Sequence, residues 1–278
     1  MQKISKIVIS SENKKKLKGK VIKLVTIKSK KEIELMKEAC RIARETHKRV
    51  EQAIKPGVST KTLDEIAEKY ILSQKAIPAQ KNYPSYYDNI PDFPATLCIS
   101  INDVLIHGIP SDKIIVKDGD IVSIDLVVLK DGYHGDCART YLVGNVSEEA
   151  KRLVEVTRKA FFEGIKYAKK GYRLGDISSA IGNYVSQNGY SVVKEFQGHG
   201  IGKEMHEEPG IPNYGKPGKG IRLMPGMTLA IEPMVIAGKE GVLELDDGWS
   251  IVSQDGSLTA HYENTVLITE NEPQILTL

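Results

Sequence analysis

The stretch SIDLVVLKDGYHGDCART, residues 123–140, decides the fold prediction because it is typical of a β-hairpin with an acid on each arm. An apolar run leads into Asp131-Gly132, a dipeptide that favours a tight turn, and a second strand returns after it. Asp125 precedes the turn and Asp136 follows it, so pairing of the arms brings the two carboxylates near each other. A carboxylate within an apolar strand is costly to bury unless it is paired or bound to a metal. Either acid taken alone is more simply explained as facing solvent.

Two further acids also lie in strand-like sequence, Glu232 in MTLAIEPMVIAG and Glu263 in LTAHYENTVLIT. Four carboxylates that share one interior repel each other, so they need a cation to remain ionised. His199, in GHGIG, offers a fifth ligand. A set without thiolates suits Mn, Fe(II) or Co better than a tetrahedral structural zinc. Four acids outnumber the needs of one ion, so we expect two divalent ions bridged by carboxylates.

Hydrophobic spacing on either side of the hairpin predicts two pairs of helices. Residues 33–54 form the first helix, and the second follows with Thr60 as its cap. Ser147 caps a third helix that runs to about Lys169, and a fourth ends at Asn188-Gly189. The order helix, helix, strands thus occurs twice. This repeated order indicates an α+β fold with a pseudo-twofold repeat, and such a fold places a site at its centre. The alternative is that the second helices of the two pairs align by coincidence, as any two amphipathic helices can.

The composition of the 278 residues favours a soluble intracellular protein. No run approaches the roughly 18 apolar residues of a membrane span, and the three cysteines show no CxxC spacing, so we expect a cytoplasmic protein without membrane contact. Residues 1–31 contain eleven lysines and one acid, which leaves a net charge of −7 in residues 32–278. We therefore predict a flexible basic extension over residues 1–25 and a catalytic domain over residues 26–278.

The five ligand residues, together with the sequences DGYHGD, GHGIG, HEEP, IEPM and HGIP, resemble a type I methionine aminopeptidase, a metallopeptidase of the pita-bread fold, from about residue 26 onward. The resemblance implies a central antiparallel sheet with outer helices, and an enzyme that removes the initiator methionine from nascent chains with a small second residue. It makes Asp136 and Glu263 bridging ligands, Asp125 a ligand of one ion, and His199 and Glu232 ligands of the other. The ions are Fe(II), Mn or Co, with Zn as an alternative.

The same resemblance assigns roles in catalysis. Glu232 transfers the proton of the attacking water, His206 stabilises the carbonyl oxygen of the substrate, and His107 steadies the leaving amide. An apolar pocket for the methionine side chain would have five walls: Phe93, Cys98, His107, Met205 and Trp249. Met205 stands where the family more often has phenylalanine, and the loop 81–98 is several residues longer than usual.

Two alternatives remain at the sequence level. A proline-directed peptidase of the same fold would share all five ligands, and a catalytically inactive binding protein would keep only the fold. The basic extension is most simply a solvated tail, but an enzyme that acts on nascent N-termini works beside ribosomal RNA, which lysines attract electrostatically. We therefore expect nascent chains as partners, a ribosome contact through the extension, and a monomer.

Overall fold

The computed structural model describes residues 25–278, in which pairs of helices alternate with groups of strands. The helices are α1 (Lys30–Ala53), α2 (Thr60–Ser73), α3 (Glu148–Ile165) and α4 (Leu174–Gln187). Between α2 and α3 lie β1 (Ile77–Pro78), β2 (Cys98–Ile101), β3 (Val104–Ile106), β4 (Ile121–Lys130) and β5 (Tyr133–Leu142). After α4 come β6 (Ser191–Val192), β7 (Gly198–Gly200), β8 (Glu207–Ile211), β9 (Thr228–Ile231), β10 (Met234–Ile236), β11 (Val242–Glu244), β12 (Ile251–Ser253), β13 (Thr259–His261), β14 (Asn264–Leu267) and β15 (Gln274–Ile275). The predicted basic extension lies, apart from Val25, outside the described residues.

The predicted hairpin is the longest strand pair among the described residues. β4 and β5 pair antiparallel over ten residues each, from Ile121 opposite Leu142 to Lys130 opposite Tyr133. Both turn residues have positive φ, 49° at Asp131 and 80° at Gly132, which is the conformation of a type I′ turn. The other edge of β4 pairs with β1 and β2.

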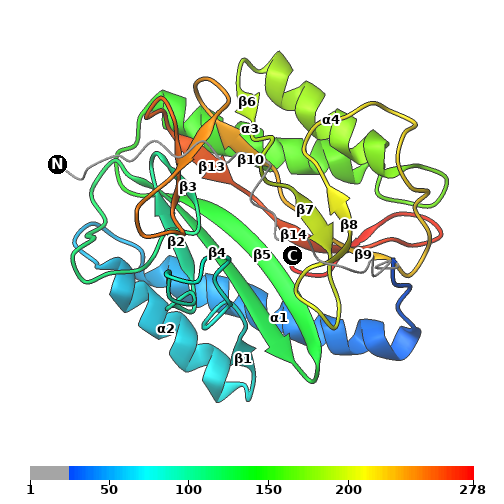
Figure 1. Cartoon of the computed structure of the whole chain (residues 1–278), viewed down its shortest axis with the longest axis horizontal. Helices are drawn as coiled ribbons and strands as arrows, with labels where there is room; N and C mark the ends of the chain where they lie inside the picture. The colour runs from blue at the N-terminus through cyan, green and yellow to red at the C-terminus, as the bar shows by residue number, and fades with distance from the viewer. Residues whose placement is uncertain (1–24) are drawn as a thin grey trace.

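The second half of the chain builds a five-stranded antiparallel sheet in the order β15-β14-β9-β7-β8. Two shorter sheets lie beside it, β13-β10-β6 and β11-β12-β3, and the latter includes β3 from the first half of the chain. Backbone hydrogen bonds between Ala138 of β5 and Glu263, 3.0 and 3.4 Å long, join the two halves. The hydroxyl of Thr265 strengthens the joint, since it donates to the carbonyl of Asp136 and accepts from its amide. The α+β architecture is therefore confirmed, with strands in the middle and helix pairs outside (Figure 1).

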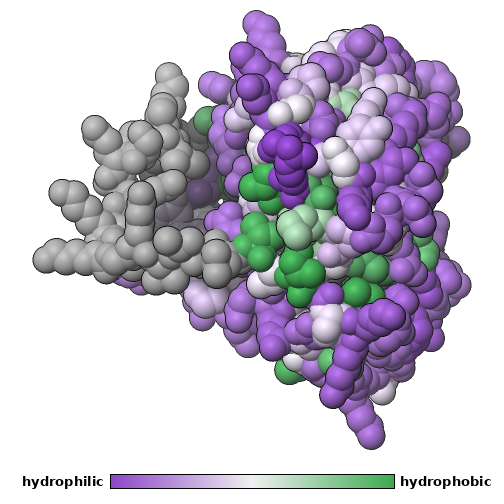
Figure 2. Space-filling view, turned by 90° about the vertical axis from the view of Figure 1, so that its right-hand side faces the viewer, coloured by the Kyte–Doolittle hydropathy of each residue, from purple (hydrophilic) through white to green (hydrophobic). Residues whose placement is uncertain are grey.

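Each helix pair covers its own half of the strands with an apolar core. On the hairpin side, Ile42 of α1 and Leu63 of α2 pack with Ile124, all fully buried. On the other side, α3 and α4 bury Phe161 and Ile177 against β9 and β14. Burial of one such side chain contributes about 1.5–3 kcal/mol. The face shown in Figure 2 is mainly hydrophilic, with a small group of apolar residues at its centre.

The helix ends differ from the prediction at two points. Ser59, not Thr60, caps α2, because its hydroxyl accepts from the amide of Thr62, and Thr60 is the first helical residue. The third helix ends at Ile165 rather than near Lys169, because the chain tightens there into turns with bonds to carbonyls three residues back. The predicted Ser147 cap is confirmed. No helix within residues 25–278 is long and apolar enough to cross a membrane.

Candidate active site

The hairpin places two carboxylates on one face of its strands. Asp125 in β4 lies opposite Ala138, and Asp136 in β5 lies opposite Val127. Residues offset by two positions on paired strands share a face and lie within side-chain reach. Asp136 is buried, with 3% of its surface exposed, and Asp125 is nearly so. Pairing thus brings the two acids together, as the sequence predicts.

The joint between the halves brings Glu263 to the same place. Its backbone bonds to Ala138, two residues from Asp136, and the residue itself is 2% exposed. One oxygen each of Asp136 and Glu263 and a ring nitrogen of His199 lie within 4.8 Å of one another, a spacing that a metal ion can span. Glu263 does not lie within a strand, because β13 ends at His261 and β14 starts at Asn264.

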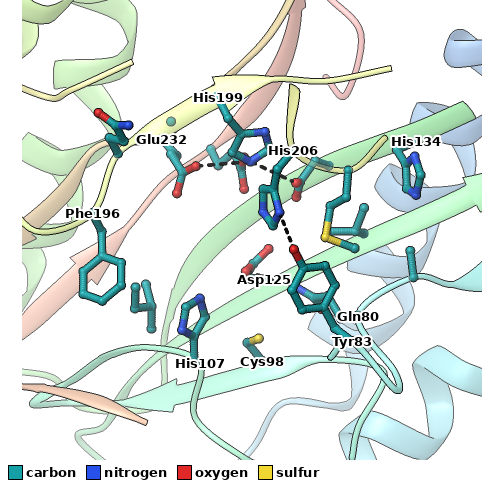
Figure 3. A pocket seen from close by; sticks show the side chains of 18 of the residues that line it. Gln80, Tyr83, Cys98, His107, Asp125, His134, Phe196, His199, His206 and Glu232 are labelled. Carbon is teal, nitrogen blue, oxygen red and sulfur yellow. Dashed lines mark hydrogen bonds and ion pairs between the residues drawn. The ribbon is translucent and has the colours of Figure 1, made fainter. Parts of the chain in front are cut away.

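His199 and Glu232 complete the group from the second sheet. His199 in β7 pairs with Ala230 of β9, two residues before Glu232, which lies in the gap between β9 and β10 that Pro233 enforces. His199 Nε2 is 3.5 Å from Glu232 Oε1 and 3.8 Å from Asp136 Oδ2. Its Nδ1 donates to the carbonyl of Gly200 at 2.9 Å, so the neutral ring carries no proton on Nε2. The lone pair of Nε2 therefore faces the acids (Figure 3).

Burial disfavours the charged form of these four acids and raises their pKa values. It raises the pKa of Glu232 to about 8 and that of Asp125 to about 6. The pKa values of Asp136 and Glu263 lie well above their usual range, because burial and then the neighbouring carboxylates disfavour the charged form. Burial lowers the pKa of His199 to about 3, so its ring is neutral.

The donor atoms fit a divalent cation. Three buried carboxylate oxygens have no hydrogen-bond partner: Asp125 Oδ1, Asp136 Oδ1 and Glu263 Oε1. A buried carboxylate oxygen without a partner is costly, and a cation would satisfy all three. Four carboxylates and one imidazole are hard to borderline ligands, as divalent first-row metals prefer.

All eleven side chains predicted for the site line one cleft of about 930 Å³. They are Phe93, Cys98, His107, Asp125, Asp136, His199, Met205, His206, Glu232, Trp249 and Glu263. His206 lies in front of the acids, at the exposed end of the loop that leads into β8, and His107 and Cys98 lie on another wall (Figure 3). His107 adopts φ of +58°, a conformation that costs a non-glycine residue energy and that clusters at functional sites.

Three of the five residues predicted to surround the methionine side chain lie together on one side of the cleft. Phe93 and Trp249 meet edge to face with ring centroids 5.2 Å apart, and both pack in one cluster with Cys98. The Trp249 Nε1 donates to the carbonyl of Pro91, which closes the long loop onto this wall. Met205 is buried and also faces the cleft.

Three further residues of the site were missed in the sequence. Gln80 Nε2 donates to Asp125 Oδ2 at 3.1 Å, and the hydroxyl of Tyr83 lies 2.9 Å from His206 Nδ1. His261 Nε2 lies 3.4 Å from Glu232 Oε2. Gln80 and Tyr83 carry no periodic signal, but His261 precedes Glu263 by two residues, and strand alternation would place both on one face.

Comparison with known proteins matches residues 34–270 to the metallopeptidase family M24. A methionine aminopeptidase from Clostridium acetobutylicum is 50% identical over 255 residues, which cover 92% of this chain and 99% of that relative. The crystal structure of a methionine aminopeptidase from Rickettsia prowazekii has a TM-score of 0.87 and 41% identity, and the match covers 92% of this chain and 100% of that one. A prolidase from Pyrococcus horikoshii is more distant, with a TM-score of 0.69 and 26% identity over 91% of this chain and 63% of the prolidase. The residues that match the family include every side chain of the cleft.

Proposed function

Because this chain belongs to metallopeptidase family M24, we propose that its cleft holds two divalent metal ions. The proposed ligands are Asp125, Asp136, His199, Glu232 and Glu263. Three unpartnered carboxylate oxygens and an imidazole lone pair that faces the same space support this assignment. Asp136 and Glu263, the most buried of the four acids, would hold metal together with the other three residues, and Fe(II), Mn or Co would suit the set best, with Zn as the alternative.

The chain is a metal-dependent aminopeptidase that removes N-terminal methionine, the activity named for relatives that are up to half identical over nearly its whole length. Its substrates are the N-termini of nascent polypeptides. We propose that cleavage requires a small second residue.

The side chains around the acids provide the remaining chemistry. Divalent cations at such a site lower the pKa of a bound water and polarise a carbonyl group. Glu232 takes the proton of the attacking water and delivers it to the leaving amine. His206 donates a hydrogen bond to the carbonyl oxygen as negative charge develops there, which is worth roughly 10²–10³ in rate.

His107 stabilises the leaving side of the scissile bond. Burial lowers its pKa to about 4, so the ring is neutral at pH 7 and offers one donor and one acceptor. Phe93, Cys98, Met205 and Trp249 form an apolar pocket beside it. An apolar, aromatic-lined pocket with one thiol matches a thioether side chain.

The observation that carries this function is the convergence of four carboxylates and one imidazole, drawn from both halves of the fold, on one cleft with an apolar end. To test it, the purified protein is incubated with Mn, Fe(II) or Co and with Met-Ala-Ser, acetylated Met-Ala-Ser or Ala-Pro-Ser, and the products are measured by mass spectrometry. We expect free methionine from Met-Ala-Ser alone. Preferred cleavage of Ala-Pro-Ser would show a proline-directed peptidase, and no cleavage with any metal would show a binding protein.

Variants separate the roles of the two loop histidines. His199→Ala should lose metal, whereas His206→Ala should keep its metal and lose mainly kcat. Glu232→Gln should weaken one metal position and lower kcat by roughly 10² or more. Equal metal loss in both histidine variants would contradict the assignment of His206.

We also propose that residues 26–278 act as one monomeric catalytic domain in the cytoplasm, and that the lysines of residues 1–25 bind ribosomal RNA. A variant that starts at Val25 should keep its activity on short peptides and bind ribosomes more weakly at low salt, with a shallower salt dependence. Identical co-sedimentation with and without the extension would contradict the RNA contact.

A further inference from the structure

Tyr83 connects the long loop to the histidine that faces the substrate carbonyl. Its hydroxyl lies 2.9 Å from His206 Nδ1, and the two rings meet edge to face at 86° with centroids 5.5 Å apart (Figure 3). Tyr83 belongs to the loop of residues 81–98. This contact therefore joins that loop to the reaction centre.

The backbone of Tyr83 is held on both sides. Its amide donates to the carbonyl of Gln80, and its carbonyl accepts from the amide of Phe93 at 2.9 Å, which closes the neck of the loop. The preceding segment is fixed to β4, because the amide of Ala79 donates to Val127 and the side chain of Gln80 donates to Asp125. The ring of Tyr83 packs against the Phe93 cluster. The hydroxyl is thus presented to His206 from a rigid base, as a positioning group requires.

Relative acidity favours one direction of this hydrogen bond. A phenol, with a pKa of about 10, is a far stronger acid than the N–H of a neutral imidazole, so the arrangement in which the O–H donates and Nδ1 accepts is favoured. Burial, and after it the neighbouring hydroxyl of Tyr86, raise the pKa of Tyr83 further, which keeps that proton on the hydroxyl at neutral pH. A neutral imidazole that accepts at Nδ1 carries its proton on Nε2.

We propose that Tyr83 is a positioning residue for His206: its hydroxyl holds the ring in one orientation and in the tautomer whose Nε2–H donates to the substrate carbonyl. The inference rests on the role proposed above for His206. It assigns to the long loop a function in turnover beyond its contribution to the apolar pocket. A neutral hydrogen bond contributes about 0.5–1.5 kcal/mol, so its loss should lower kcat about 2- to 13-fold.

A double-mutant cycle tests the coupling. Tyr83→Phe keeps the ring and its packing and removes only the hydroxyl. In the otherwise unchanged protein, Tyr83→Phe should lower kcat for Met-Ala-Ser about 2- to 13-fold, with KM and metal content nearly constant. In the His206→Ala protein, Tyr83→Phe should have no effect on kcat. Tyr87→Phe is the matched control, because it removes another hydroxyl of the same loop, one bonded to Glu244.

Nuclear magnetic resonance reports the protonation and hydrogen bonding of His206 Nδ1, which would not change if Tyr83 only helped the loop to pack. In the ¹⁵N-histidine-labelled, zinc-loaded protein, His206 should show a hydrogen-bonded, unprotonated Nδ1 and a protonated Nε2, with His206→Ala giving the assignment. Tyr83→Phe should shift the Nδ1 signal to that of a free nitrogen, and Tyr87→Phe should not.

The outcomes are distinguishable. If Tyr83→Phe costs the same in both backgrounds, or if Nδ1 of His206 is protonated, Tyr83 does not position His206 and the inference is wrong. If His206→Ala leaves kcat unchanged, the role proposed for His206 fails first and the inference fails with it. If even the unchanged protein releases no methionine, the proposed function itself is wrong.

Discussion

Binding of metal to the metal-free protein should release protons, because burial keeps the acids of the site protonated. The pKa of Glu232 is about 8, so this group holds about 0.9 of a proton at pH 7. Asp136 and Glu263, with pKa values well above their usual range, hold up to one more each. Asp125, with a pKa of about 6, adds about 0.1, and His199, with a pKa of about 3, adds none. We expect about one to three protons released at pH 7 when the site is filled.

Isothermal titration calorimetry with Mn(II) measures this number. The observed heat is recorded in several buffers of different ionisation enthalpy, and its slope against that enthalpy gives the protons released. Metal and protons compete, so the apparent affinity for Mn(II) should rise with pH through the range in which these acids lose their protons, including pH 8 for Glu232. Glu232→Gln should release about one proton fewer. A release near zero at pH 7 would show that the acids are already charged without metal, and the reasoning from burial would be refuted.

Three predictions concern the framework of the site. Lys28→Met removes the charged partner of Glu207, whose side chain is 9% exposed and 2.5 Å from the lysine, and leaves Glu207 the Thr26 hydroxyl and the Glu204 amide as donors. The change should cost about 3 kcal/mol, seen as a Tm lower by about 6–12 °C; an unchanged Tm would show that the pair is not stabilising. Gly135→Ala would place a methyl group 2.5 Å from the backbone nitrogen of Cys40 in α1, so we expect a loss of about 1–3 kcal/mol in urea unfolding and weaker metal binding, and full stability would contradict the close packing. Burial lowers the pKa of His47 to about 3, so between pH 6.5 and 5 this histidine gains a proton in the unfolded state but not in the folded state. The free energy of unfolding should therefore fall by about 2 kcal/mol more over this pH range in the unchanged protein than in His47→Gln. Equal changes in the two proteins would contradict the burial of His47 as a neutral ring.

The parts of the fold that were predictable carry local signals. Asp131-Gly132 can adopt two positive φ angles in succession, so the turn of the hairpin follows from the dipeptide itself. Ser147 precedes two glutamates and an apolar repeat, and it caps α3 as expected. Once both arms of the hairpin are placed, the pairing of Asp125 and Asp136 follows from the two-residue period of strands.

The remainder depends on contacts that are distant in sequence. The apolar runs around Glu232 and Glu263 do not show where the strands break, because one break comes from Pro233 and the other from the bond between Glu263 and Ala138. Tyr83 lies 123 residues from His206 in an aperiodic loop, so no local pattern could bring them together. The five proposed ligands are recognisable in the sequence only as a group, through the flanking motifs of the family.

Anomalous X-ray diffraction from crystals grown with Mn(II) tests the metal site most directly. The account predicts two peaks a few ångströms apart in the cleft, both in contact with Asp136 and Glu263, one also bound by Asp125 and the other by His199 and Glu232. Full occupancy should coincide with release of methionine from Met-Ala-Ser by the same preparation. No peak in the cleft, or peaks bound by other residues in a preparation that is active, would contradict the account.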